Sequence, residues 1–258
     1  MALAARPPMP HTTSSGRLSR KITLNVESQH INVRPLIKGA INEAAHTLAD
    51  AYENNPLLNW ILEPIKDSSK ARDVNHVMFK AALNCASVQS RDFAIQVEGC
   101  KGVCIWSTND QHLSFAKVLG WKLTKLANLS VAMPLFLQRI NMGLQSFLDK
   151  SKKKVMKSQP HIYINYMGVL PQERRKGLGS ALIQHVISKA EIANLPIYIV
   201  VSDSAAVPFF ESMGFQVHQV ANCGSIPSTL MIRPASSYSN PPATLKLKPG
   251  RRDSDDSM

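Results

Sequence analysis

The chain has 258 residues, 44% of them hydrophobic, and a formal net charge of +12 at pH 7. This length suffices for one sizeable core with tails or for two small domains, and the hydrophobic content is ordinary for a globular protein. No run of about 18 apolar residues occurs, so the sequence predicts no membrane-spanning helix, and the excess of basic residues would attract a polyanion.

An acid-free stretch begins the chain. The first carboxylate is Glu27, and four basic residues precede it. This composition loosely resembles a mitochondrial presequence, but three prolines within the first ten residues would break a long amphipathic helix. We expect residues 1–28 to form a disordered basic tail, with mitochondrial targeting as the alternative.

Hydrophobic periodicity predicts the elements that follow. Apolar residues at three- and four-residue spacings predict helices over 37–52 and 74–85. Short apolar runs predict strands at 31–34, 93–97 and 102–106, the last two joined by a tight turn.

The cysteines show neither zinc nor redox spacing. We interpret them as reduced thiols of an intracellular, cytoplasmic protein and predict no metal site. They are Cys85, Cys100, Cys104 and Cys223.

Residues 107–160 are the part that the sequence determines least. Apolar-rich helical patterns occur at 119–126 and 133–148, and a cluster of lysines ends the segment. A helical hairpin that covers the sheet and a wall of a ligand pocket both fit this pattern.

The most informative stretch is V-L-P-Q-E-R-R-K-G-L-G-S-A-L at 169–182. It lies between a predicted strand at 161–169 and an amphipathic helix pattern. Gly177 and Gly179 allow the backbone to approach a ligand, and the first N–H groups of a helix have no intrahelical acceptor. Together with the helix dipole and three adjacent cations, these donors predict a diphosphate site over residues 174–180. Neither a G-x-G-x-x-G fingerprint nor a triphosphatase loop is present.

A second strand is predicted at 196–201, followed by a short helix at 204–213 for which Asp203 is the expected N-cap. The last strands are predicted at 215–220 and 229–232. Residues 235–258 are rich in Ser, Pro and Lys, and we expect a disordered C-terminal tail there.

Two of these stretches resemble the GNAT superfamily of acetyl-CoA-dependent N-acetyltransferases. R-x-x-G-x-G, with V-x-P ahead of it, resembles motif A, and residues 202–215, ending in F-F-E-S-M-G-F, resemble motif B. An acidic or amide pair before P-x-x-x-W, here N-N-P-L-L-N-W at 54–60, is common in the puromycin-type, fungal-like branch. The resemblance covers residues 29–234 and implies a mixed α/β fold, with a central, mostly antiparallel sheet splayed between two strands and flanked by helices. It also implies that the insertion at 107–160 walls the acceptor pocket.

The resemblance further implies acetyl-CoA as the cofactor and direct attack of a neutral amine on the thioester, without a metal or an enzyme nucleophile. The strand backbone at 167–169 would pair with the pantetheine, and the turn would bind the diphosphate. The implied coenzyme-binding residues are Met167, Gly168, Val169, Arg174, Arg175, Lys176, Gly177, Leu178, Gly179, Ser180 and Phe210.

The sequence departs from the family at acid and base positions. Phe210 stands where the family has a tyrosine that donates to the CoA sulfur, and Val200 stands where the puromycin-type branch has a glutamate. Tyr163 or His161, acting through water, could replace these groups, and period-two alternation would place Tyr163 on the same strand face as Val169.

Two functions remain open on these grounds. The chain is an N-acetyltransferase for a small-molecule amine, or it is an acetyl-CoA-binding module with little or no catalysis. A protein acceptor, and a nucleic acid or acidic partner bound by the basic tails, are the weaker alternatives. The sequence leaves the oligomeric state open.

Overall fold

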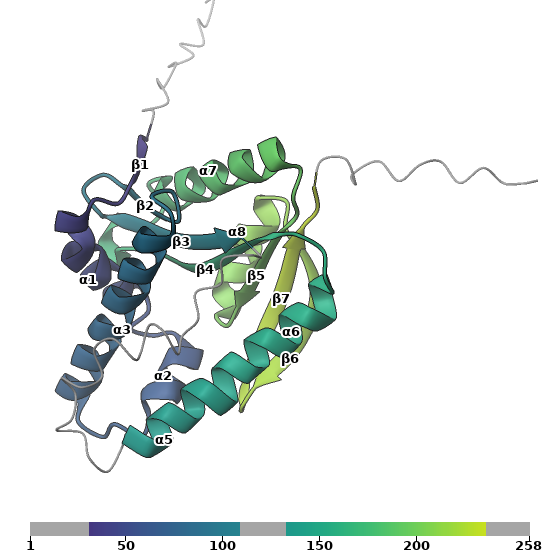
Figure 1. The fold of residues 1–258 in the computed structure, drawn as a ribbon. Helices are drawn as coiled ribbons and strands as arrows, with labels where there is room; N and C mark the ends of the chain where they lie inside the picture. Colours follow the sequence, from purple (N-terminus) through teal and green to yellow (C-terminus); the bar gives the residue numbers. More distant parts are fainter. Residues whose placement is uncertain (1–30, 109–132, 236–258) are drawn as a thin grey trace, which may run out of the picture. The chain divides into compact units, whose positions relative to one another are not determined.

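The computed structural model describes residues 31–108 and 133–235 (Figure 1). The predicted tail at 1–28, the helical pattern at 119–126 and all of the C-terminal tail except Ala235 lie outside these residues. None of the described helices combines the length and apolar character needed to cross a bilayer.

Seven strands form one sheet in the order β1-β2-β3-β4-β5-β7-β6. All neighbouring pairs are antiparallel except β4 and β5, which are parallel. The mixed α/β fold with a mostly antiparallel sheet is therefore confirmed. The strands are β1 (Val33–Pro35), β2 (Ala94–Val97), β3 (Gly102–Thr108), β4 (Ile162–Val169), β5 (Ile197–Val201), β6 (Gln216–Cys223) and β7 (Ile226–Arg233).

Several helices begin where the sequence supplies a side-chain cap, and α7 begins at a glycine. Asn55, Asp67 and Asp203 each accept hydrogen bonds from the first N–H groups of the turn or helix that follows. The helices are α1 (Ile41–Ala51), α2 (Pro56–Leu62), α3 (Ser68–Gln89), α5 (Met133–Gln138), α6 (Ser146–Met156), α7 (Leu178–Ala193) and α8 (Val207–Ser212). A π-helical segment at Arg139–Gln145 joins α5 to α6.

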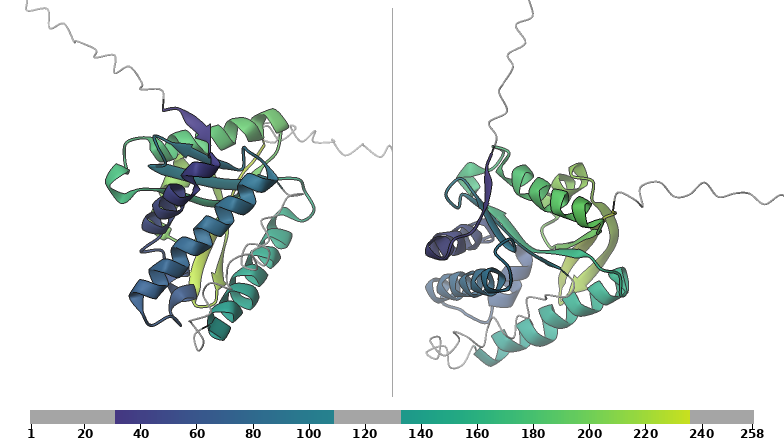
Figure 2. Two further views of the ribbon diagram at one scale, coloured as in Figure 1. Left: turned by 60° about the vertical axis from the view of Figure 1, so that its left-hand side comes forward. Right: turned by 45° about the horizontal axis from the view of Figure 1, so that its top comes forward.

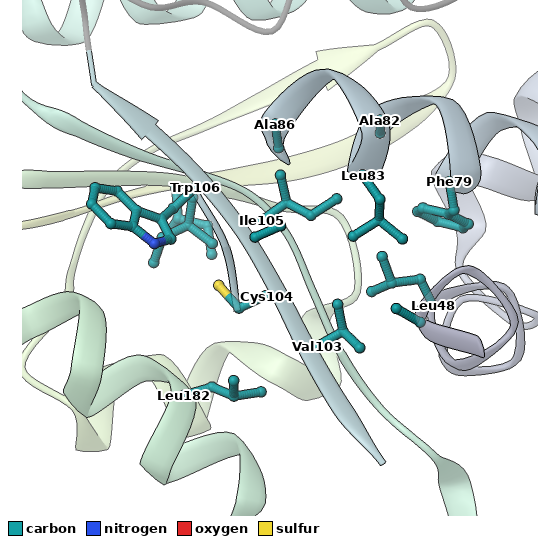
Figure 3. Packing of buried hydrophobic residues seen from close by; sticks show 14 of the residues in the cluster. Leu48, Phe79, Ala82, Leu83, Ala86, Val103, Cys104, Ile105, Trp106 and Leu182 are labelled. Carbon is teal, nitrogen blue, oxygen red and sulfur yellow. The ribbon is translucent and has the colours of Figure 1, made fainter. Parts of the chain in front are cut away.

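The helices cover both faces of the sheet. Helices α1 and α3 lie on one face and α7 on the other, and α6 lies on the side opposite α7 (Figures 1 and 2). Figure 3 shows the core around β3, where Val103 and Ile105 face Leu48 and Leu83, while Cys104 faces the α7 side. These residues are buried, because β3 is covered on both faces.

Strands β4 and β5 separate after a short paired stretch. They pair only at Ile162–Ile197, Tyr163–Tyr198 and Ile164–Ile199. From there β4 continues to Val169 with β3 as its only strand partner among the described residues, so the predicted splay of the sheet is confirmed.

A β-bulge lies at the point of separation. Ile164 pairs with Trp106 and Tyr166 pairs with Ile105, which leaves Asn165 as an extra residue in β4. Its side-chain amide donates a 2.9 Å hydrogen bond to Ser107 Oγ. A bulge changes the side-chain alternation beyond it, and this alters which residues reach each face.

Candidate functional site

A cavity of about 890 Å³ opens where β4 and β5 separate. Its walls are the open part of β4, the end of β5, the turn before α7, and residues of α1, α2, α3, α6 and α8. Both predicted motifs therefore contribute to one cavity.

The turn before α7 presents a set of backbone donors. Arg175 (φ 63°) and Gly177 (φ 82°) have left-handed backbone conformations, and Gly177 is the N-cap of α7 without a side-chain cap. The first bond of the helix runs from Ala181 N to Gly177 O. Among the described residues, the N–H groups of residues 175–180 have no hydrogen-bond acceptor, so six unbonded donors lie at or just before the positive end of the α7 dipole.

The three cations of the turn differ in their partners. Arg174 donates to the carbonyl of Ala51 at the end of α1 (3.2 Å), and Lys176 pairs with Glu173 (2.8 Å) and does not line the cavity. The hydrogen bond from Lys176 lowers the pKa of Glu173. Arg175 lines the cavity and has no ion-pair or hydrogen-bond partner in the described part of the chain. Because a left-handed conformation is costly for a non-glycine residue, its occurrence at Arg175 suggests a functional constraint.

Gly179 and Gly168 both line the cavity, but a glycine is present at each position for a different structural reason. The atoms nearest to a Cβ built at Gly179 would be those of the Phe209 ring, from 3.5 Å, and Val169 Cγ2 at 3.8 Å, which are ordinary van der Waals distances, so packing does not require a glycine there. Gly168 differs, because a Cβ would lie 2.6 Å from Ala51 Cβ and 3.2 Å from Leu48 Cδ2. Gly168 thus permits close packing of α1 on β4, whereas the absence of a side chain at Gly179 keeps the cavity open beside the donors.

Of the two predicted proton-transfer candidates, only Tyr163 lines the cavity. Its ring stacks on Tyr198 at 5.6 Å, and burial raises the pKa of Tyr163 well above its ordinary value. His161 is 2% exposed and its Nδ1 lies 2.8 Å from Gln159 O. Burial lowers the pKa of His161, so it is neutral at pH 7, and it is not among the residues that line the cavity.

The predicted common face of Tyr163 and Val169 is wrong. Tyr163 packs against the cluster of Met156, Tyr198 and Leu230, whereas Val169 Cγ2 lies 3.8 Å from a Cβ built at Gly179 in the first turn of α7. Helices α6 and α7 lie on opposite sides of the sheet (Figure 2). The physical reason is the bulge at Asn165, which inserts one residue and inverts the alternation between the two positions.

The departures at acid and base positions also lie at the cavity. Phe210 and Val200 line it, and Phe210 is 5% exposed with its ring against Phe209 and Phe215. None of these side chains can exchange a proton. Any proton transfer in the cavity must therefore use other groups or water.

The side of the cavity away from α7 is formed by α2, α3 and α6. Leu144, Leu148, Asp149 and Lys152 line it from the π-helical segment and α6. Part of the predicted insertion is therefore a cavity wall and does more than cover the sheet.

Asn55 connects two of the walls. Besides capping α2, its side chain exchanges hydrogen bonds of 3.0 and 3.2 Å with Ser202 Oγ, just beyond β5. The amide pair before Pro56 is evident in the sequence, but the contact of Asn55 with Ser202 is not, because the two residues are 147 positions apart.

Trp60 holds the wall of the insertion against the rest of the domain. Arg139 lies over its ring at 5.0 Å, donates to its carbonyl and pairs with Glu63 at 2.6 Å. A Cβ at Gly224, in the β6–β7 turn, would lie 2.8 Å from Trp60 Cε2. The indole is thus enclosed by α2, the insertion and the hairpin, which fixes the three relative to one another.

Tyr52 belongs to the site, although the sequence predicts it only as the last residue of a helix over 37–52. It directly follows α1, lines the cavity, and its Oη accepts a 3.3 Å hydrogen bond from Met167 N. Burial raises the pKa of Tyr52 to about 12. Nothing local in the sequence indicates this contact, since the two residues are 115 positions apart.

Known proteins resemble both the sequence and the fold. Residues 142–215 match the sequence profile of the acetyltransferase (GNAT) family. A Corynebacterium glutamicum protein described as histone acetyltransferase HPA2 and related acetyltransferase is 17% identical at a TM-score of 0.50, over 80% of this chain and 97% of that one. Agmatine N-acetyltransferase is 13% identical (TM-score 0.52; 79% and 98% covered), and the mosquito arylalkylamine N-acetyltransferase like 5b is 10% identical (TM-score 0.51; 78% and 98% covered). At these identities the structural matches show that the chain has the GNAT fold.

Proposed function

We propose that this chain is a GNAT-type N-acetyltransferase that transfers the acetyl group of acetyl-CoA directly to an amine. The observation that carries the proposal is the group of unbonded N–H donors at the start of α7, where every donor residue except Lys176 lines the cavity at the splay of the sheet. The family match at residues 142–215 includes this turn and supports the same reading.

The residues present fit acetyl-CoA. The donors of residues 175–180 and the guanidinium of Arg175 would hold the diphosphate, and the open backbone of β4 from Met167 to Val169 would pair with the pantetheine amides. Phe210 would contact the arm through its ring. When bound, acetyl-CoA supplies an activated acetyl group, and the protein contributes binding, orientation and proton transfer.

The cavity is suited to a small amine. Although the whole chain is basic, the cavity is lined by five carboxylates and only three Lys or Arg side chains. Two of those cations, Arg174 and Arg175, belong to the turn, and the third, Lys152, lies on α6 beside Asp149. Away from the turn the carboxylates therefore outnumber the cations, which favours a cationic ligand there. Apolar side chains of α2, α3 and α6 would contact the body of the amine, as in most small-molecule sites.

An attacking amine must be neutral, so a bound ammonium has to lose a proton. Of the two predicted candidates for proton transfer, Tyr163 reaches the cavity. In our proposal Tyr163 orders a water molecule that accepts this proton. His161 has no such access and has no part in the proposal. The four free cysteines fit a reducing, intracellular compartment.

The test has two stages. Calorimetry with acetyl-CoA measures binding, and a panel of apolar primary amines, polyamines and peptides is then screened for release of free thiol. Binding with turnover on a small amine supports the proposal, and turnover on peptides alone would replace the acceptor class. Binding without acetylation of any amine would favour the alternative, a non-catalytic acetyl-CoA-binding module, to which the aliphatic and aromatic residues at positions 200 and 210 also point.

A nucleic-acid partner is tested separately. Retention of the protein on nucleic acid after deletion of residues 1–28 and 236–258 would support a nucleic-acid-associated role for the folded domain. If the protein is no longer retained on nucleic acid once both tails are deleted, the binding is due to the charge of the tails alone.

A further inference from the structure

The hydroxyl of Tyr52 lies beside β4 where this strand has parted from β5. The N–H of Met167 donates to Tyr52 Oη at 3.3 Å, so it points away from β3 and toward the gap. Both residues line the cavity. A backbone donor and a phenol hydroxyl are therefore adjacent at the edge of the open strand.

Packing fixes the position of this hydroxyl. The ring of Tyr52 contacts Phe79 and Tyr166, with centroids 5.3 and 6.0 Å away. The absence of a side chain at Gly168 lets Ala51, one residue before Tyr52, approach β4 closely. A donor held in this way needs little reorganisation to act, which is the property that makes oxyanion-binding groups effective.

The hydroxyl is a donor under ordinary conditions. Because burial raises the pKa of Tyr52, the phenol keeps its proton at neutral pH. Its oxygen accepts from Met167, and no acceptor for its own proton is recorded in the described part of the chain. The proton is therefore available to a ligand in the cavity.

We infer that the Tyr52 hydroxyl donates a hydrogen bond to the carbonyl oxygen of the acetyl thioester, an inference that rests on the proposed acetyl transfer. The Met167 N–H, which donates to Tyr52 Oη at 3.3 Å, holds this hydroxyl in place and polarises it, which strengthens it as a donor. Tyr52 thus becomes a catalytic residue that stabilises negative charge on this oxygen.

Tyr52 keeps its own proton in this scheme. As the amine nitrogen bonds to the carbonyl carbon, the carbon–sulfur bond breaks, the nitrogen loses one proton and the departing sulfur gains one. The hydroxyl only strengthens its hydrogen bond while charge develops. Its role therefore differs from that of the tyrosine that the family usually has at the position of Phe210.

The competing explanation is structural, because Tyr52 could simply anchor the end of α1 to β4. Tyr52→Phe separates the two roles, since it keeps the ring contacts with Phe79 and Tyr166 and removes only the hydroxyl. Tyr198→Phe is the matched control, because the hydroxyl of Tyr198 is buried, has no partner among the described residues and lies outside the cavity.

The decisive measurement is the carbonyl stretching band of bound acetyl-CoA labelled with ¹³C at the carbonyl, taken by infrared difference spectroscopy. We expect a lower frequency with the wild-type protein and the Tyr198→Phe variant than with Tyr52→Phe. Calorimetry should show that Tyr52→Phe weakens acetyl-CoA relative to CoA by a factor of roughly 2 to 10, as expected for one net hydrogen bond. With a reactive amine, kcat should fall by about 10²-fold.

The outcomes distinguish this inference from the proposed function. No binding of acetyl-CoA to the wild-type protein would overturn both. Binding with an unchanged carbonyl band in Tyr52→Phe, or an equal loss of affinity for CoA and acetyl-CoA, would overturn the inference alone and leave Tyr52 a structural role.

Discussion

Replacing Gly179 by aspartate tests the diphosphate site with a change that the fold should tolerate. The built Cβ meets only side-chain atoms at 3.5–3.8 Å, and the position is helical. Losing a helical glycine favours folding by about 0.5–1 kcal/mol, and a carboxylate in the first turn adds about 0.3–1 kcal/mol. We expect a melting temperature equal to or above that of the wild-type protein.

The same carboxylate should abolish coenzyme binding. Two like charges about 4 Å apart repel by about 4 kcal/mol at the effective dielectric constant of a protein surface. Since about 1.4 kcal/mol corresponds to a tenfold change, the Kd for acetyl-CoA should rise by about 10³-fold. Calorimetry measures the Kd. The Gly179→Asn variant has a side chain of the same shape without the charge, so its Kd for acetyl-CoA should rise much less than that of Gly179→Asp. An unchanged Kd in Gly179→Asp would refute the assignment of this turn to the diphosphate.

Three further predictions concern other parts of the cavity. Arg175→Gly removes a left-handed non-glycine residue, so its melting temperature should not fall, while calorimetry should show the Kd for acetyl-CoA raised by about 10- to 100-fold through loss of a charged hydrogen bond. A parallel loss of stability would contradict this reasoning. Gly224→Ala forces an alanine to φ 61° against Trp60 and should cost about 1–3 kcal/mol in urea unfolding, with a raised KM for the amine and an unchanged Kd for acetyl-CoA. Phe210→Tyr should raise kcat in the thiol-release assay by supplying a donor for the departing sulfur, and an unchanged rate would show that this proton is not limiting.

The sequence predicted the elements whose determinants are local. The helix at α7 and the turn before it follow from glycine spacing and amphipathic periodicity, and Asp203 was correctly identified as an N-cap. The parting of β4 and β5 was expected only because the two motifs resemble those of the GNAT superfamily, and pairing confirms it. Boundaries differed by several residues in α3, which begins at Ser68 with the Asp67 cap.

The errors and omissions come from contacts between distant segments. The bulge at Asn165 depends on how β4 pairs with β3, and the sequence of β4 alone does not indicate it. The predicted face of Tyr163 was therefore wrong. Arg175 was recognised as a cation, but its left-handed conformation, for which sequence reasoning expects glycine, was not. Lys176 was grouped with the other cations although Glu173, three residues earlier, is a local partner that the sequence could have indicated.

The distribution of charge explains why composition misdirects the search for a partner. A net charge of +12 suggests a polyanion, yet the cavity carries more carboxylates than cations. The cations Arg174 and Arg175 and the donors of α7 serve an anion, whereas away from this turn the lining carboxylates Asp50, Glu53, Asp149 and Asp203 outnumber the single cation Lys152. Strand β4 borders both parts of the cavity, and its bulge changes which side chains face α6 before the strand reaches the turn. In the proposed reaction the anionic acetyl-CoA enters from the side of the turn and the cationic amine enters from the other side. The reacting atoms then meet at the backbone of β4, because this strand borders both sides.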